Sequence, residues 1–283
     1  MNKYSFDDLK DKVCVLTGGG GVIGAALAKG LTNVGVKLAI LDIKKEFADQ
    51  VVNELKNSMA VAAIGVEANV LDKSSLENAK KVVLDKLGNV DILINGAGGN
   101  SPKATTKDEF ITDDNIKSLN DTFFGLEIEG FQKVFDLNFL GTLLPTMVFA
   151  KEMVERKSGV VLNISSMNSF RPLTKIPAYS AAKSSINNFT EWLAVHFAKM
   201  NVRVNAIAPG FFLTNQNRFL LINEATKGLT ARGKKILDNT PMGKFGEPED
   251  LVGATLFLLS DTSNFITGVV LPIDGGFNIY SGV

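Results

Sequence analysis

Short apolar segments alternate with longer amphipathic segments along most of the chain. Most of the apolar segments are rich in Val, Ile, Leu and Ala and have little polar alternation, which is typical of strands covered on both faces. The pattern predicts strands at 13–17, 37–41, 60–66, 91–96, 160–166, 202–208 and 269–274.

The segments between these strands carry apolar residues at helical spacing. The pattern predicts helices at 24–34, 46–58, 74–87, about 133–157, 178–200 and 248–260. Regular strand–helix alternation favours right-handed βαβ units. The expected fold class is therefore α/β, a doubly wound sheet of seven parallel strands with helices on both faces, in a single domain over residues 1–283.

Two connections are too long for this scheme, one at about 99–132 and the other at about 211–247. Long connections in a compact domain are usually functional or disordered. Both contain Phe and Leu residues, so we expect ordered lids that cover a substrate site.

Composition narrows the function classes. Lys+Arg and Asp+Glu are each 30, the apolar fraction is 45% and charged residues make up 21%, so we expect a globular protein without nucleic-acid or membrane partners. The start MNKYSFDDLKDK lacks the apolar region of a secretory signal, and we expect a cytoplasmic protein. One cysteine, Cys14, and one histidine, His196, exclude an internal disulfide and the usual zinc site, so no metal is expected.

A glycine-rich stretch follows the first expected strand and opens the first expected helix. It reads TGGGGVIGAALA, from Thr17 to Ala28. Gly19, Gly21 and Gly24 fit the G-x-G-x-x-G pattern of dinucleotide-binding turns. Such glycines let backbone N–H groups approach a pyrophosphate, and the helix N-terminus adds partial positive charge. We therefore expect a phosphate cradle here.

An acidic residue at the end of the second expected strand indicates which dinucleotide binds. Asp42 stands 18 positions after Gly24 (42 − 24), close to the spacing at which a carboxylate binds the ribose hydroxyls of NAD. Its charge would repel the 2′-phosphate of NADP. Lys44 and Lys45 follow closely and could tolerate that phosphate, so NAD is the expected cofactor and NADP the less favoured alternative.

A Tyr-x-x-x-Lys sequence, Tyr179 to Lys183, lies on an expected helix, where positions i and i+4 share a face. A nearby ammonium stabilises phenolate, so we expect a lowered pKa for Tyr179, which suits a general acid or base. Ser166 closes a strand 13 residues earlier (179 − 166) and can hold a substrate oxygen. Together these residues predict proton transfer at a carbonyl or alcohol.

These motifs together resemble the short-chain dehydrogenase/reductase family over essentially the whole chain. The matching pieces are TGGGGVIG, Asp42, NGAG (95–98), Asn138 in DLNFLGT, NISS ending at Ser166, Tyr179 with Lys183, and PGFFLT (209–214). The resemblance implies a Rossmann-like fold and hydride transfer to or from a nicotinamide. It also implies a homotetramer or homodimer, with His196 in a helix–helix or subunit contact.

The resemblance implies a role for each matching residue. Tyr179 would be the catalytic acid or base, Ser166 would position the substrate, and Lys183 would bind the nicotinamide ribose and tune Tyr179. Asn138 would hold a water on the proton path. The implied cofactor contacts are Gly18, Gly19, Gly21, Val22, Ile23, Gly24, Asp42, Asn69, Val70, Asn95, Gly96, Ala97, Tyr179, Lys183, Pro209, Gly210, Phe212 and Thr214.

The chain departs from the family pattern at two places. The family has glycine at the position of Val22, and we expect the run of glycines before it to supply the needed freedom. The family often has Asp-Val after the third strand, where this chain has Asn69-Val70. An Asn can still bond the adenine edge, so a small effect is expected.

The long connections carry amide and cationic groups, which suit a hydroxylated substrate with a carboxylate, such as a sugar acid. The expected substrate contacts are Lys103, Ser166, Asn168, Arg171, Lys175, Asn215 and Arg218. For Lys103, Arg171 and Lys175, plain solvation is an equal alternative.

Within the family, AGGNSPKATT (97–106), the insertion after it, and TKIPAYSAAKSSINNFTEWLAVHF (174–197) resemble the short-chain-type D-mannonate oxidoreductases, or fructuronate reductases. This resemblance implies bacterial hexuronate metabolism, with D-fructuronate and NADH giving D-mannonate and NAD reversibly. The alternative is another sugar-acid or polyol dehydrogenase, such as a gluconate 5-dehydrogenase. A remote alternative is a non-catalytic nucleotide-binding protein, although such proteins commonly lose the Tyr, Lys or Ser.

Overall fold

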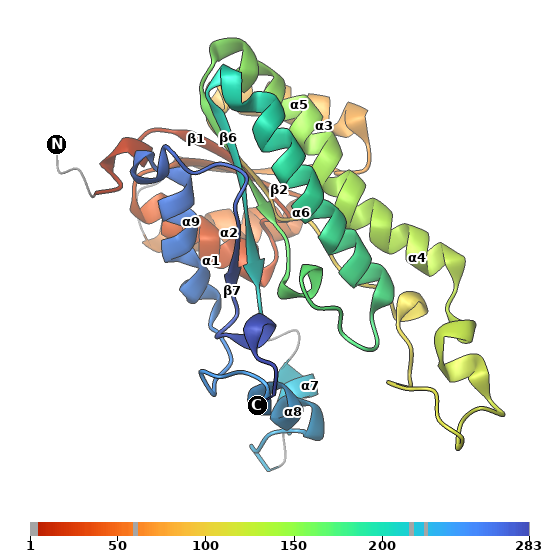
Figure 1. Cartoon of the computed structure of the whole chain (residues 1–283). Coiled ribbons are helices and arrows are strands. Elements are labelled where there is room, and N and C mark those ends of the chain that lie inside the picture. Colours follow the sequence, from red (N-terminus) through yellow and green to blue (C-terminus); the bar gives the residue numbers. More distant parts are fainter. Residues whose placement is uncertain (1–4, 59–61, 215–217, 224–225, 283) are drawn as a thin grey trace.

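A seven-stranded parallel sheet forms the centre of the protein (Figure 1). The computed structural model describes residues 5–58, 62–214, 218–223 and 226–282. The strands lie in the order β3-β2-β1-β4-β5-β6-β7, which confirms the predicted fold class. Their bounds are Val13–Thr17 (β1), Lys37–Asp42 (β2), Ala63–Glu67 (β3), Ile92–Asn95 (β4), Gly159–Ile164 (β5), Val202–Pro209 (β6) and Val270–Ile273 (β7).

Helices cover both faces of the sheet (Figure 1). One face carries α1 (Val22–Asn33), α2 (Lys45–Ser58) and α9 (Val252–Leu259), and the other carries α3 (Lys73–Lys86), α5 (Gly141–Arg156) and α6 (Pro177–Phe197). A further helix, α4 (Ile128–Phe135), extends beyond the sheet and packs against α6. Successive strand residues point to opposite faces. Cys14 and Leu16 therefore pack with the first group of helices and Val13 and Val15 with the second, which explains the continuous apolar runs of the sequence.

The helix expected at about 133–157 is longer than predicted and is interrupted. It begins at Ile128, and a π-helical segment, Asp136–Leu140, separates α4 from α5. The Thr142 hydroxyl donates a hydrogen bond to the Asn138 carbonyl in this segment (2.9 Å). Single π-helical turns re-aim the side chains they carry and frequently occur at functional sites, and this one carries the buried Asn138.

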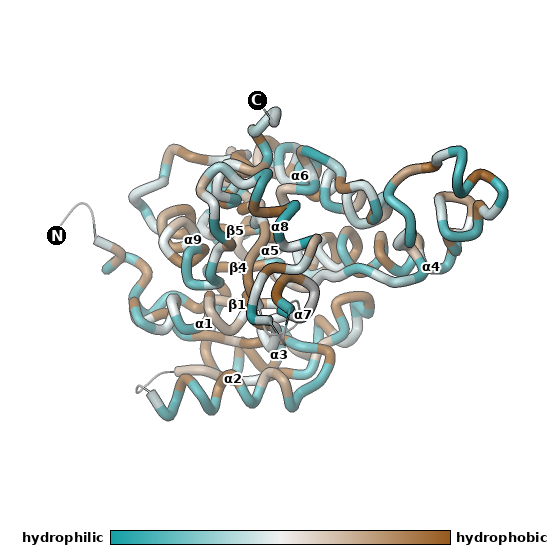
Figure 2. The backbone as a smooth tube through the Cα atoms, turned by 90° about the horizontal axis from the view of Figure 1, so that it is seen from below, coloured by the Kyte–Doolittle hydropathy of each residue, from teal (hydrophilic) through white to brown (hydrophobic). Residues whose placement is uncertain are grey.

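The first long connection forms an arm, residues 99–127, that projects from the body beside the start of α4 (Figures 1 and 2). It contains only short 3₁₀ turns, at Pro102–Ala104, Leu119–Asp121 and Phe123–Gly125. Gly130 of α4 is buried against the backbone of Lys103, where a Cβ would lie 2.8 Å from the carbonyl carbon. This close packing fixes the base of the arm on α4.

The second long connection, residues 211–247, carries two helices, α7 (Arg218–Leu221) and α8 (Ala231–Asp238). The Thr230 hydroxyl caps α8 by accepting a hydrogen bond from the Gly233 N–H (2.9 Å). Over its described residues this connection is therefore an ordered structure. The chain then continues through α9 and returns to the sheet as β7.

Several residues set aside on sequence grounds are buried or engaged in packing. Burial raises the pKa of the Cys14 thiol above its ordinary value, which makes it an inert core group. His196 stacks on Trp192 with ring centroids 4.7 Å apart.

Over the described ranges, no group of three His, Cys, Asp or Glu side chains could hold a metal ion. Among the helices described, none is long and apolar enough to cross a membrane.

Candidate active site

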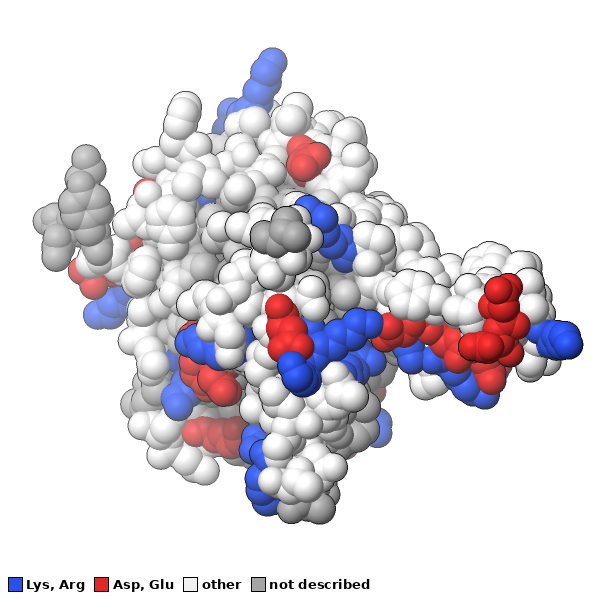
Figure 3. Space-filling view, turned by 60° about the horizontal axis from the view of Figure 1, so that its bottom comes forward, with Lys and Arg blue, Asp and Glu red and all other residues white. Residues whose placement is uncertain are grey.

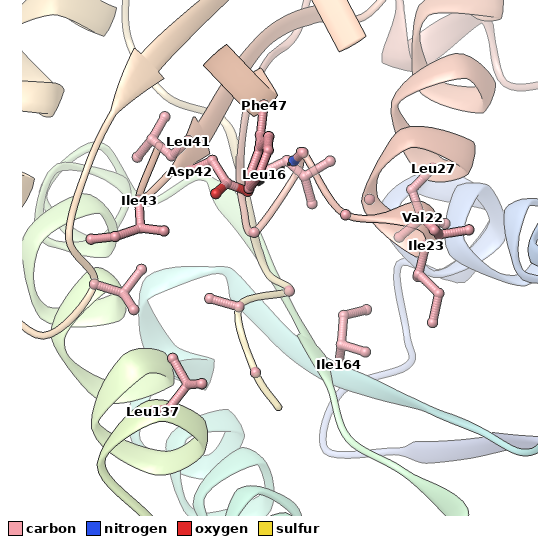
Figure 4. A pocket seen from close by; sticks show the side chains of 18 of the residues that line it. Leu16, Val22, Ile23, Leu27, Leu41, Asp42, Ile43, Phe47, Leu137 and Ile164 are labelled. Atoms are coloured by element: carbon pink, nitrogen blue, oxygen red, sulfur yellow. Dashed lines mark hydrogen bonds between the residues drawn. The ribbon is translucent and has the colours of Figure 1, made fainter. Parts of the chain in front are cut away.

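A groove opens at the carboxyl ends of β1 and β4, where the strand order reverses direction (Figure 4). Ligands bind at such switch points in open α/β sheets. The groove has a volume of about 900 Å³. The predicted cofactor residues that line it are Gly18, Gly21, Val22, Ile23, Gly24, Asp42, Asn69, Val70, Gly96, Ala97, Gly210, Phe212 and Thr214.

The glycine-rich turn is so close-packed that side chains would not fit at several positions. Gly18 has φ +64°, in the left-handed region that favours glycine. A Cβ on Gly24 would lie 2.6 Å from the Gly19 Cα and 2.7 Å from the Gly18 carbonyl oxygen. Gly21 is the N-cap of α1, so Val22 is simply the first helical residue. The departure at Val22 thus leaves a helix N-terminus suited to a pyrophosphate.

Asp42, at the end of β2, lies against the glycine turn and accepts a hydrogen bond from the Gly20 N–H (3.1 Å; Figure 4). The nearby cations are engaged elsewhere, because Lys44 Nζ lies over the Phe47 ring (5.3 Å to the centroid) and Lys45 pairs with Asp49 (2.5 Å). A carboxylate in this position binds ribose hydroxyls and disfavours a 2′-phosphate. The groove therefore fits NAD better than NADP.

Some predicted cofactor residues lie behind the groove wall. A Cβ on Gly19 would meet Ile40 at 2.7 Å, so Gly19 packs against β2. The Asn95 amide donates to Thr146 and to Asn163 (both 2.9 Å), which ties β4 to α5 and β5 beneath the groove. Pro209 is buried at the end of β6. These residues shape the groove through the backbone, and the Asn95 side chain points into the core.

Other lining residues were missed by sequence reasoning. They are Gly20, Ile43, Phe47, Gln50, Ala68, Leu71, Leu137 and Ile164, together with the core residues Leu16, Leu27 and Leu41. Gly20 could have been found, because it lies within the glycine run, where it was taken as a spacer. A Cβ there would lie 2.6 Å from Phe47 and 2.8 Å from the Asp42 carboxylate. The apolar lining residues carry no local signature that separates them from core positions.

Ser166, Tyr179 and Lys183 come together beside this groove. Ser166 follows β5 and caps a 3₁₀ turn, accepting a hydrogen bond from the Asn168 N–H (3.2 Å). Its side chain hydrogen-bonds Tyr179, near the start of α6. One helical turn further, Lys183 Nζ donates to the Ile164 carbonyl (2.7 Å) and lies 5.6 Å from the Tyr179 ring centroid.

Burial dominates the protonation of this group. It raises the pKa of Tyr179, and the Ser166 hydrogen bond offsets only part of that effect. The expectation that Lys183 lowers the pKa of Tyr179 is therefore wrong for this structure. Burial also lowers the pKa of Lys183 itself, to about 7, which weakens the positive charge that would stabilise a phenolate. At neutral pH Tyr179 is protonated, the form that a general acid needs.

Asn138 lies behind Lys183, with its side chain fully engaged. Its amide donates to the carbonyls of Gly99 (2.7 Å) and Val134 (2.8 Å), and its Oδ1 accepts from the Gly99 N–H (3.3 Å). A Cβ on Gly98 would lie 2.7 Å from the Asn138 Oδ1 and 3.2 Å from Lys183 Nζ. The side chain thus fixes the end of the β4 loop beside Lys183.

The predicted substrate residues are not all in one place. Asn168 is buried next to Ser166, and over the described residues its Oδ1 has no hydrogen-bond partner. Lys175 Nζ donates to the Lys107 carbonyl on the arm, whereas Lys103 pairs with Glu127.

Three further predicted residues complete this set. Arg171 is exposed on the loop after Ser166, and Arg218 is exposed at the start of α7. Asn215 lies outside the described residues. Among these predicted substrate contacts, Asn168 is thus the one that lies buried two residues after Ser166 with an unpaired polar atom, over the described residues.

Comparison with known proteins gives consistent matches over the whole chain. A family profile described as enoyl-(acyl carrier protein) reductase matches residues 20–278. An uncharacterized oxidoreductase of Haemophilus influenzae is 50% identical over 284 residues, which are 100% of this chain and 99% of the relative. The 5-keto-D-gluconate 5-reductase of Escherichia coli strain K12 is 32% identical over 269 residues, 95% of this chain and 96% of the relative.

A solved structure is similar at the level of the fold and the cofactor. The crystal structure of a Haemophilus influenzae protein, assigned as a D-mannonate oxidoreductase and solved with bound NAD, superposes with a TM-score of 0.91 at 50% identity. The match covers 98% of each chain. The groove described above thus has a counterpart in a structure that holds NAD.

Proposed function

The chain belongs to the short-chain dehydrogenase/reductase family, and we propose that it interconverts D-fructuronate and D-mannonate with NAD as cofactor. The observation that carries this proposal is the hydrogen-bonded pair of Ser166 and Tyr179, with Lys183 behind it, beside a glycine-lined groove. The name of the NAD-bound structural neighbour supports the choice of substrate.

In this proposal the groove residues hold the dinucleotide. The glycine turn and the N-terminus of α1 face the pyrophosphate, and Asp42 faces the adenosine ribose. When bound, the nicotinamide ring supplies or accepts a hydride. Gly98 leaves room beside Lys183, which in this proposal would bond the nicotinamide ribose.

Tyr179 and Ser166 act on the substrate oxygen. For D-fructuronate the reacting carbonyl is at C5, counted from the carboxylate carbon. Ser166 holds this oxygen, and the protonated Tyr179 donates its proton to it as negative charge develops. In the reverse direction Tyr179 must start as the phenolate and accept the proton of the substrate hydroxyl, so oxidation of D-mannonate should be favoured by alkaline pH.

The buried amide of Asn168 provides a second contact. Its Oδ1 lacks a partner within the described part of the chain, and a buried unsatisfied acceptor is costly. A substrate hydroxyl beside the reacting carbon would satisfy it. A site that bonds a hydroxyl in this way rejects analogues that lack it, which favours a polyhydroxylated substrate.

The proposal is tested by NADH oxidation with purified protein and D-fructuronate, with 5-ketogluconate and NADPH in parallel. We expect oxidation of NADH with D-fructuronate and little with NADPH. Reaction with 5-ketogluconate alone would instead identify a gluconate 5-dehydrogenase, the candidate favoured by the Escherichia coli relative. NADH binding without turnover of any sugar acid would favour a non-catalytic nucleotide-binding protein.

We further propose that the protein is a homodimer or homotetramer in the cytoplasm, where the nicotinamide pool lies. Large apolar side chains are exposed on α5 and α6, among them Met147, Trp192 and Val195. Exposed apolar patches of this kind mark protein contacts. Light scattering gives the molar mass directly, and a Trp192→Glu variant should shift it towards the monomer.

A further inference from the structure

The Glu109 carboxylate on the arm lies near cationic side chains from two other parts of the chain. Glu109 forms an ion pair with Lys235 of α8. The hydrogen bond from Lys235 lowers the pKa of Glu109 most, desolvation opposes it in part, and weaker charge interactions with Lys235, Lys175 and Arg232 lower the pKa further. Figure 3 shows basic and acidic side chains meeting where the arm joins the body. Three cations thus surround one anion.

The cluster lies at the substrate side of the site. The Thr106 N–H donates to the Lys175 carbonyl (3.0 Å), which joins the arm to the loop between Ser166 and Tyr179. Lys175 belongs to the loop that runs along the chain from Ser166 to Tyr179, and its ammonium donates to the Lys107 carbonyl on the arm. Arg232 and Lys235 are three residues apart on α8 and share a face.

We propose that Lys175, Arg232 and Lys235 form the binding site for the carboxylate of the substrate, and that Glu109 occupies this site until the substrate arrives. The inference rests on the proposed function, which supplies the anionic substrate. The reaction chemistry then stays with Ser166 and Tyr179, while this cluster selects for an acid over a neutral sugar.

The exposure of the cluster makes the exchange of carboxylates physically reasonable. The side chains of Lys235 and Glu109 are 59% and 35% exposed. Exposed ion pairs contribute little free energy, with a median of about 0–1 kcal/mol. A substrate carboxylate can therefore replace Glu109 at small cost.

A purely mechanical role predicts a different outcome. If the Glu109–Lys235 pair only ties the arm to α8, removing either partner should weaken turnover of acidic and neutral substrates alike. If Glu109 competes with the substrate carboxylate, the two partners should have opposite effects. Removing Lys235 should weaken binding of the acid, whereas removing the charge of Glu109 should strengthen it.

The experiment compares Lys235→Met and Glu109→Gln with the wild type in NADH oxidation. D-Fructuronate is the acid, and D-fructose is its neutral counterpart, with a hydroxymethyl group in place of the carboxylate. We expect Lys235→Met to raise KM for the acid about three- to fivefold and Glu109→Gln to lower it by about twofold or more, because exposed pairs are weak. Values of kcat/KM for D-fructose should stay unchanged.

Matched controls exist on both elements. Lys234→Met removes a neighbouring charge on α8 that pairs with Asp238, and Asp114→Asn removes an exposed negative charge from the arm. Both should leave KM for the acid unchanged. If Lys235→Met and Lys234→Met behave alike, or if Glu109→Gln raises KM for both substrates, the proposed carboxylate site is wrong.

A binding measurement separates this inference from the reaction assignment. Calorimetric titration of D-mannonate or D-gluconate into the same proteins measures the affinity of the cluster for a sugar acid, even where turnover of D-fructuronate is absent. The wild-type affinity should fall between about 50 and about 500 mM salt, because salt screens exposed charges. Lys235→Met should lose part of that dependence and Lys234→Met should keep it. Equal salt dependence in all three proteins would overturn the inference.

Discussion

Different kinds of interaction hold the cofactor groove and the proposed substrate side of this enzyme together. The groove is made of short turns between buried strands, and an added methyl group on Gly24 would overlap neighbouring backbone at 2.6 Å. The proposed substrate side is made of two long connections that meet through exposed charges such as Glu109 and Lys235. One region is fixed by close packing, and the other by contacts that each contribute little.

This difference bears on the kind of ligand that each region can bind. A packed turn has one arrangement, so it suits a cofactor that is the same in every turnover. Exposed ion pairs can exchange partners at small cost, so the arm and the α8 segment suit a site that must admit and release a substrate. Tyr179 and Lys183 lie at the junction of the two regions, because Tyr179 packs against a cluster that includes Ala104 of the arm and Lys183 lies beside Gly98 of the groove.

Replacing Tyr179 by Phe gives the largest effect and tests the junction. The change removes the phenol that donates the proton and keeps the ring, so kcat should fall about 10²- to 10⁴-fold. The dissociation constant for NADH, measured by fluorescence titration, should stay within about twofold because the groove is untouched. A variant that keeps a tenth or more of the wild-type kcat would contradict the proposed role of Tyr179.

The sequence was most informative where the structure is packed. Strands such as β1 and β5 were found because residues buried on both faces form continuous apolar runs. The glycine turn and Asp42 were found because each has a steric or electrostatic requirement at a fixed spacing. The path of the arm was not predictable, since it depends on the fit of Gly130 against Lys103, which no local pattern encodes.

Two features of the site show what spacing leaves out. Asn95 stands in a motif expected to shape the cofactor floor, and spacing does not reveal that its amide donates to Thr146 and Asn163 in the core. The i,i+4 spacing places Lys183 near Tyr179 but gives no measure of burial. Burial controls both pKa values, and it follows from the assembled fold.

Changing Asp42 to Ala should alter nucleotide choice while leaving the substrate side intact. The variant loses the charge that disfavours a 2′-phosphate, so the ratio of kcat/KM for NADPH to that for NADH should rise about tenfold or more. KM for the sugar acid should not change. Asp42→Asn is the control, since its amide oxygen can keep the hydrogen bond from the Gly20 N–H.

An unchanged nucleotide ratio in Asp42→Ala would mean that Asp42 does not face the 2′-hydroxyl. A changed KM for the sugar acid would mean that the two regions are coupled, against the separation described above. The Asp42→Asn control separates the two contributions of this residue. If it behaves like Asp42→Ala, the charge matters, and if it behaves like the wild type, the bond to the glycine turn matters.

The smallest expected effect concerns the pH dependence of stability. It tests whether burying the Lys183 ammonium at the junction lowers the free energy of unfolding. Burial holds its pKa at about 7 in the folded protein, against an ordinary value of 10.5. Between these values the unfolded chain binds more protons than the folded one, so the free energy of unfolding should rise with pH. From pH 6 to pH 8 this contribution is about 1 kcal/mol. Urea unfolding of the cofactor-free protein measures it, with Lys183→Met as the comparison. The variant should lack that part of the rise, whereas equal pH dependence in both proteins would mean that Lys183 stays charged within the fold.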